Sequence, residues 1–179
     1  MKGFERIKAV NSSTPAMARA LPELPMGETI LVRMLRIGVA GMTGFFEPVF
    51  RSLDLTENGF HVLCLLSASD SGSLSPGELS ELVGTSRANM TRILESLSKD
   101  GLVSRTTPRT DARRQIIHIT KQGKACCSDA VPRMVAPLKI AFSELTEEEK
   151  EALNTLLRKL ILSFDKPAFP LGKSPENNG

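Results

Sequence analysis

The feature of this sequence that most constrains its fold is residues 75–119, where two capped helices are followed directly by two β-branched segments. The first helix is expected to begin at Ser75-Pro76-Gly77-Glu78. This stretch combines a capping serine, a proline at the first helical position and a glutamate three residues after the cap. The helix is expected to end at Gly84, and a second one follows almost at once. Two helices joined by so short a turn are the sequence form of a helix-turn-helix.

The second helix, predicted from Thr85 or Ser86 to Lys99, has two different faces. At about 100° per residue its apolar side chains cluster on one side. The apolar side holds Met90, Ile93, Leu94 and Leu97. The opposite side holds Ala88, Thr91, Arg92 and Glu95, with Arg87 and Asn89 on the flanks. Such a helix packs one face on its partner helix and leaves the other free to lie in a groove of DNA.

After Gly101 the hydrophobic period changes to about two, which is typical of strands. Residues 102–107 and 115–119 are rich in β-branched side chains and are predicted to pair as a hairpin. The tip of this hairpin, residues 108–114, is polar and basic. The order helix, helix, strand, basic loop, strand predicts a winged helix-turn-helix, so the expected fold class is mainly α with a small β-wing (α+β).

Further helices are predicted on both sides of this motif. Residues 28–47 form a long apolar helix that is expected to end at Pro48, and Thr56 caps another helix to about residue 67. After the wing, Thr120 caps a helix from residue 121 that contains two prolines, for which a kink or break is expected. Residues 146–149 are a capping box for a last helix. Its apolar stripe is Leu153, Leu156, Leu157, Leu160 and Ile161.

These outer helices carry more apolar surface than one small domain can bury, which predicts a homodimer. We divide the sequence into an N-terminal extension, one folded domain and a C-terminal tail. The extension is residues 1–27, the domain is residues 28–165 and the flexible tail is residues 166–179. Within the domain the winged helix-turn-helix covers about 54–120, and the dimerisation helices cover about 28–47 and 121–165.

The positive charge is concentrated on the motif. The whole chain has a formal net charge of +3, yet residues 85–114 hold seven basic and three acidic residues, a net charge of +4. The remainder of the chain therefore sums to −1. A basic cluster on both the second helix and the hairpin tip is the electrostatic footprint expected for double-stranded DNA.

Composition argues against several other classes. The two histidines, His61 and His118, show no spacing of a catalytic triad or a metal site, so neither an enzyme nor a cofactor or metal is expected. Three cysteines are too few for a disulfide scaffold and fit a reducing cytoplasm. The most apolar stretch, residues 30–46, is interrupted by Arg33 and Arg36. It is judged too short and too charged to span a membrane.

The chain resembles the MarR family of bacterial winged-helix regulators, most closely the branch that represses multidrug efflux pumps (EmrR/MprA type). The resemblance covers about residues 28–165. It rests on short segments in a fixed order: Leu55-Thr56, Pro76-Gly77-Glu78-Leu79, the recognition helix at 85–92, residues 97–102, Asp111-Ala112-Arg113-Arg114 in the wing, and Ile119-Thr120-Lys121-Gln122-Gly123 after it.

The resemblance implies a dimer clasped by its first and last helices, which reads a pseudo-palindromic operator and usually represses. Carried over by position, the recognition-helix candidates are Ser86, Arg87, Asn89, Thr91 and Arg92. In the wing, Arg113 would contact DNA beside Arg109 and Arg114, and Asp111 would orient the wing through a charge-assisted hydrogen bond.

The family also implies release from DNA by a small, often phenolic or lipophilic, ligand. The hypothetical pocket lies where the helix at 28–47, the helix from Thr56 and the helix from Lys121 meet. Its candidate residues are Arg33, Met34, Ile37, Phe60, His61 and Cys64. Simple core and dimer packing is the alternative for these residues. Two other functions stay open: a redox-switched repressor that uses Cys64, and a winged-helix dimer that binds only protein.

Overall fold

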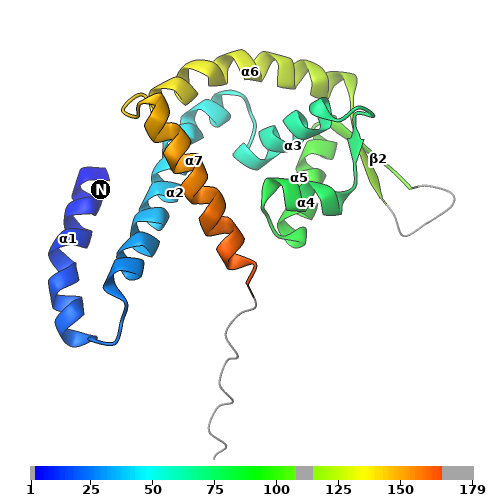
Figure 1. Ribbon diagram of the computed structural model, residues 1–179. Coiled ribbons are helices and arrows are strands. Elements are labelled where there is room, and N and C mark those ends of the chain that lie inside the picture. Colours follow the sequence, from blue (N-terminus) through cyan, green and yellow to red (C-terminus); the bar gives the residue numbers. More distant parts are fainter. Residues whose placement is uncertain (1–2, 108–114, 167–179) are drawn as a thin grey trace, which may run out of the picture. The chain divides into compact units, whose positions relative to one another are not determined.

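The computed structural model describes residues 3–107 and 115–166, and the chain divides into two compact units, residues 1–138 and 139–179. Figure 1 shows the elements along the chain. The first unit contains α1 (Gly3–Ala20), α2 (Met26–Ser52), α3 (Glu57–Ala68), β1 (Ser73–Leu74), α4 (Pro76–Val83), α5 (Arg87–Lys99), β2 (Val103–Thr106), β3 (Ile116–Ile119) and most of α6 (Lys121–Ala141). The second unit contains α7 (Glu147–Phe164).

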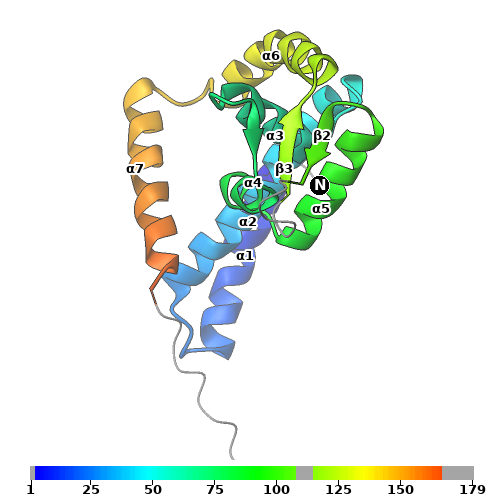
Figure 2. The same ribbon diagram turned by 90° about the vertical axis from the view of Figure 1, so that its right-hand side faces the viewer.

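A small antiparallel sheet anchors the winged part of the first unit. Its strand order is β1-β3-β2, and Ile117 at its centre pairs with Leu74 of β1 and with Arg105 of β2. Ile117 is fully buried, together with Leu63 of α3 and Leu79 of α4. Figure 2 turns the sheet toward the viewer and shows α5 beside β2. The predicted fold class, mainly helical with a small β-wing, is confirmed; within the sheet, the two-residue β1 was not expected.

The helices of the motif begin where the capping residues predict. Thr56 Oγ1 accepts a hydrogen bond from the Gly59 amide at 3.0 Å. At α4, Ser75 Oγ accepts from the Glu78 amide at 3.2 Å, and the Glu78 carboxylate accepts from the Ser75 amide at 2.8 Å. Gly84 ends α4 in the left-handed region at φ 71°, where a residue without Cβ is favoured.

Pro48 lies inside α2, so the expectation that the helix ends there is wrong. Proline supplies no N–H and costs about 3 kcal/mol or more in a helix interior. Phe46 and Phe50, on either side of it, are each only 5% exposed. Burial of two aromatic side chains contributes about 1.5–3 kcal/mol each, which is sufficient to carry the helix on to Ser52.

A kink or break is expected in the helix after the wing, and the structure shows no break. Pro132 and Pro137 lie within α6, which is continuous over Lys121–Ala141. Cys127, Ala130 and Met134, spaced three and four residues apart, are buried against the core. This anchored face holds α6 together on both sides of Pro132.

The N-terminal extension contains a helix that the sequence does not announce. Residues 12–14 lie inside α1, where their hydroxyls donate to carbonyls four residues earlier. The bonds are Ser12 to Lys8 at 2.9 Å, Ser13 to Ala9 at 2.7 Å and Thr14 to Val10 at 2.8 Å. Val10 is 2% exposed, so α1 is held by one buried contact and by its packing along α2.

Helix α2 is longer than the apolar stretch identified in the sequence, which bears on whether it can span a membrane. Its 27 residues would extend about 40 Å, and its most apolar window has a mean hydropathy of 1.4, with 6% of that window buried. By length and composition the helix is therefore able to cross a bilayer, and the judgement that the apolar stretch is too short is wrong. A helix that is covered by a second subunit in a dimer has the same length and apolar composition when one chain is considered alone.

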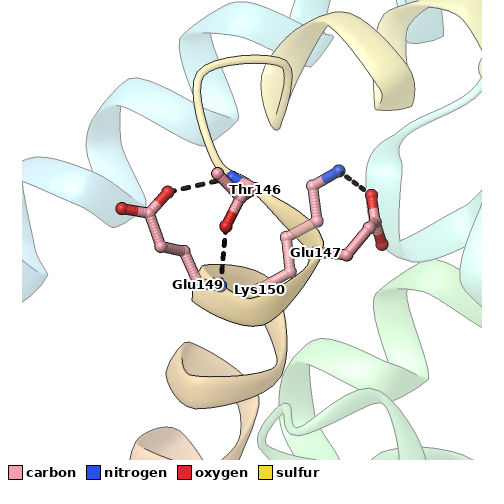
Figure 3. Close-up of polar contacts among 4 residues, drawn as sticks. All are labelled: Thr146, Glu147, Glu149 and Lys150. Carbon is pink, nitrogen blue, oxygen red and sulfur yellow. Dashed lines mark hydrogen bonds and ion pairs between the residues drawn. The ribbon is translucent and has the colours of Figure 1, made fainter.

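The second unit is the α7 helix with its cap. Figure 3 shows the predicted capping box, in which Thr146 Oγ1 accepts from the Glu149 amide at 3.2 Å and Glu149 accepts from the Thr146 amide at 2.9 Å. The Lys150 ammonium pairs with Glu147 at 2.7 Å. No residue of α7 is buried, and Leu156 and Ile161 are 62% and 60% exposed.

Candidate nucleic-acid interface

Helix α5 separates core from surface as its sequence predicts. Met90, Leu94 and Leu97 are 1%, 2% and 3% exposed and pack into the core. The predicted recognition-helix residues are all exposed: Ser86, Arg87, Asn89, Thr91 and Arg92. The apolar face therefore fixes the orientation of α5, and the polar face is presented to solvent.

Local hydrogen bonds order the first turns of α5. Ser86 Oγ caps the helix by accepting from the Asn89 amide at 3.2 Å. The Asn89 side-chain amide donates to Thr85 Oγ1 at 2.8 Å, and the Thr91 hydroxyl donates to the Arg87 carbonyl at 3.0 Å. Asn89 and Thr91 thus point their remaining acceptor oxygens from fixed positions on the helix.

The two arginines on this face keep their charge uncompensated. Neither Arg87 nor Arg92 forms an ion pair with any residue that the structure describes. Both are long donors in a fixed fork geometry that suits a phosphate or the edge of a guanine. The polar face of α5 can therefore meet an anionic duplex without first breaking internal ion pairs.

The wing is described only at its base. Strands β2 and β3 pair from Val103–Ile119 to Thr106–Ile116, and the exposed Arg105 lies on β2. Thr106 Oγ1 and His118 Nε2 are 2.8 Å apart, a diagonal contact between the two strands, because His118 pairs with Ser104. The wing candidates lie outside the described residues: Arg109, Asp111, Arg113 and Arg114.

Close packing at the base of the wing was missed by sequence reasoning. The Thr120 hydroxyl lies 2.7 Å from the Gly101 carbonyl, to which it donates, and it accepts from the Gly123 amide at 2.9 Å. A Cβ on Gly123 would stand 2.1 Å from the Leu102 carbonyl oxygen, a distance that no folded backbone tolerates. The only available signal was a glycine in the first turn of a predicted helix.

The six ligand candidates do not form one pocket within the described chain. Arg33 donates to Ser13 Oγ at 2.8 Å and contacts Met17 Sδ at 3.6 Å, so it faces α1. Phe60 instead packs against Phe50, with ring centroids 5.7 Å apart. Phe50 lies 17 residues after Arg33, about 25 Å along the helix.

The remaining candidates separate in the same way. Met34, Ile37 and Cys64 are half-buried, and His61 is exposed. Ile37 lines the groove between α1 and α2. The sequence periodicity identified the apolar face of α2 but not which end of this 27-residue helix meets α3. Within the described chain, Arg33 and Ile37 lie toward α1 while Phe60 packs against Phe50, and the six-residue pocket stays a prediction.

Two cysteines that are distant in the sequence lie side by side. Cys64 Sγ of α3 and Cys127 Sγ of α6 are 3.7 Å apart. Burial, and then the neighbouring Cys127, raise the pKa of the Cys64 thiol to about 12. Cys126, next along the helix, also has a raised pKa, mainly because of burial. The contact was not predicted, because adjacent Cys126 and Cys127 match no sequence motif.

Comparison with known proteins agrees with this geometry. The MarR family model matches residues 55–114, which run from the start of α3 to the wing. The transcriptional repressor MprA of Escherichia coli K12 is 27% identical over 144 residues, covering 80% of this chain and 82% of MprA. The HTH-type transcriptional regulator PapX of Escherichia coli is 30% identical over 146 residues, covering 80% of this chain and 87% of PapX.

A solved structure supports the fold. It is a structure of BpsR from Bordetella bronchiseptica, whose DNA binding is regulated by 6-hydroxynicotinic acid. It superposes with a TM-score of 0.67 and 24% identity, over 73% of this chain and 98% of BpsR. The winged geometry, the exposed basic face of α5 and the similarity to PapX over most of both chains lead to one assignment. The chain belongs to the MarR family and is a DNA-binding transcriptional regulator with a winged helix-turn-helix.

Proposed function

We propose that this chain acts in the cytoplasm as a homodimeric repressor that binds a pseudo-palindromic operator and is released by a small lipophilic or aromatic ligand. The observation that carries DNA recognition is the exposed face of α5, where Arg87 and Arg92 have no ionic partner among the described residues while the opposite face is buried. A rigid helix with this division is suited to enter the major groove.

The residues divide into two kinds of contact. Arg92, on the outward face, is proposed to take a bidentate contact to guanine, and Thr91 and Asn89 line the same face. Ser86 and Arg87, at the start of α5, are proposed to meet the phosphate backbone, which the helix N-terminus also favours. From the family resemblance, Arg113 reaches the adjacent minor groove or backbone and Asp111 orients the wing. Arg109 and Arg114 are proposed as further contacts, because they belong to the same basic loop.

Dimerisation is supported by the apolar side chains that the single chain leaves uncovered. On α2, Leu31, Val32 and Val39 are 63%, 56% and 59% exposed, although they lie on a helix of mean hydropathy 1.4 in its most apolar window. The stripe on α7 is likewise uncovered. Soluble monomers rarely expose apolar patches of this extent, so a second copy is the proposed cover.

Ligand release is supported by analogy with BpsR, whose DNA binding is regulated by 6-hydroxynicotinic acid. A ligand shifts a regulator off DNA only by binding one dimer geometry better than the other. The test is a gel-shift titration on DNA flanking the chain's own gene, with and without an aromatic or lipophilic acid. Operator affinity that is unchanged by every such compound would contradict ligand release, whereas no specific binding at all would contradict the repressor.

A redox switch on the same fold is the second candidate. The 3.7 Å contact between Cys64 and Cys127 favours it, since two thiols at this distance are near enough to form a disulfide after a small movement. The raised pKa of Cys64 opposes it, because the thiolate is the reactive form and is scarce at neutral pH. Loss of operator binding on mild peroxide in the wild type, but not with all three cysteines changed to serine, would favour the switch.

A further inference from the structure

A groove between α1 and α2 gathers three arginines around an apolar floor. Its volume is about 380 Å³, and Arg6, Arg33 and Arg36 lie along it with Val10 and Ile37 between them. Among the described residues, no acidic side chain lines it. The groove lies outside the part of the chain that the MarR family model matches. It is formed by α1 and α2, both of which precede the matched residues.

The sequence builds this groove through helical spacing. Residues three and four apart lie on one helix face, so Arg33 and Ile37 of α2 share the face toward α1, and Arg6 and Val10 of α1 share the face toward α2. Val10 is 2% exposed and closes the floor. Arg33 is fixed at one end by its hydrogen bond to Ser13 at 2.8 Å.

The charge of the groove is not neutralised. Neither Arg6 nor Arg36 forms an ion pair with a residue in the described part of the chain, and the hydrogen-bond partners of Arg33 are neutral. Three like charges beside a shared apolar surface repel one another, and an anion in their midst relieves that repulsion. A carboxylate also matches the planar fork of a guanidinium.

We propose that the α1–α2 groove binds a small amphiphilic carboxylate, an alkyl or aryl acid. The carboxylate accepts hydrogen bonds from Arg36 and Arg6, and its apolar part lies on Val10, Ile37 and Ala40. This inference deepens the proposed ligand response, because it names the chemical class of the ligand and a place for it. The volume of about 380 Å³ is within the range of small-molecule sites, which is about 300–1,000 Å³.

The test measures binding directly, with the full chain and without DNA. Decanoate, below its micelle concentration, is titrated calorimetrically into the wild type, Arg6→Gln, Arg36→Gln and Arg19→Gln. Arg19 lies on the same helix but outside the groove, so it is the matched control. Loss of one charge-assisted hydrogen bond weakens binding by about tenfold or more. We expect that loss in Arg6→Gln and Arg36→Gln, and wild-type affinity in Arg19→Gln.

Two further measurements test the charge of the ligand and the space in the groove. Decanamide has the same chain without the charge and is expected to bind at least tenfold more weakly. Ala9→Phe, which fills the floor without removing a charge, is expected to abolish decanoate binding while circular dichroism stays unchanged. Absence of decanoate binding, equal affinity in all three arginine variants, or equal affinity for decanamide would each overturn the proposal. Gel shifts on the same preparations without decanoate test operator binding separately.

Discussion

At the scale of single residues, Arg92 and Arg113 are expected to contribute to DNA binding by different routes. Arg92→Ala removes a side chain from the exposed face of α5, and the proposed guanine contact is worth about 1–3 kcal/mol of discrimination. Arg113→Ala, in the wing, removes a contact that depends on groove width and salt. We expect Arg92→Ala to relax sequence preference, and Arg113→Ala to weaken binding to all sequences and to reduce its salt dependence.

Competition gel shifts at several salt concentrations measure both effects. Arg158→Ala is the control, because Arg158 lies on α7 and bonds Asn154 of the same helix at 3.2 Å. Unchanged operator affinity in both Arg92→Ala and Arg113→Ala would contradict the assigned interface.

Cys64 is expected to be a slow thiol at neutral pH. Because burial and the neighbouring Cys127 raise its pKa to about 12, the thiolate fraction at pH 8 is far smaller than that of an unperturbed thiol. Alkylation by iodoacetamide, mapped by mass spectrometry, should therefore be slower at Cys64 than at free cysteine and should keep accelerating between pH 9 and 12. Labelling at pH 8 as fast as that of free cysteine would show that burial does not hold the proton on this thiol.

At the scale of elements, the base of the wing depends on Gly123. A Cβ there meets the Leu102 carbonyl oxygen at 2.1 Å and Ile119 Cγ1 at 2.9 Å. Because the first contact is with backbone, Gly123→Ala must push α6 away from the sheet, and overpacking of this kind costs about 1–3 kcal/mol or more. Urea unfolding should show that loss. Gly77→Ala is the control, since its Cβ would only touch Ser75 Oγ at 3.8 Å, and a stability as high as the control's would refute the close packing.

The elements that the sequence predicts well are those with local signals. Thr56, Ser75, Ser86 and Thr146 each cap a helix where expected, because a cap needs only residues within one turn. The predictions that failed are those that depend on contacts with residues distant in the sequence. Pro48 does not end α2, because the burial of phenylalanines outweighs the cost of a proline inside a helix. Arg33 faces α1, a helix that was not predicted from its serines and threonine. The contact between Cys64 and Cys127 joins residues 63 positions apart.

At the scale of the whole molecule, the family places this chain among regulators, not enzymes, and its proposed mode of action requires two copies. A two-fold dimer presents two α5 helices to half-sites about one helical turn apart. The apolar stripe of α7 is expected to form part of the interface, and Leu156, at 62% exposed, is one of its residues. Sedimentation of the wild type should therefore give about twice the 19.5 kDa of one chain.

Leu156→Glu is expected to dissociate this dimer. Burying one leucine contributes about 1.5–3 kcal/mol, and in a two-fold interface each substitution occurs twice. The dissociation constant should therefore rise by at least a hundredfold. Thr155→Glu introduces the same charge one residue earlier, on the opposite side of α7 from the stripe, and should leave the dimer intact. Of these two variants, only Leu156→Glu should lose operator affinity, because only Leu156→Glu should lose the dimer. A wild type that sediments as a 19.5 kDa monomer at micromolar concentration, or a Leu156→Glu dimer as stable as the wild type, would place the interface elsewhere.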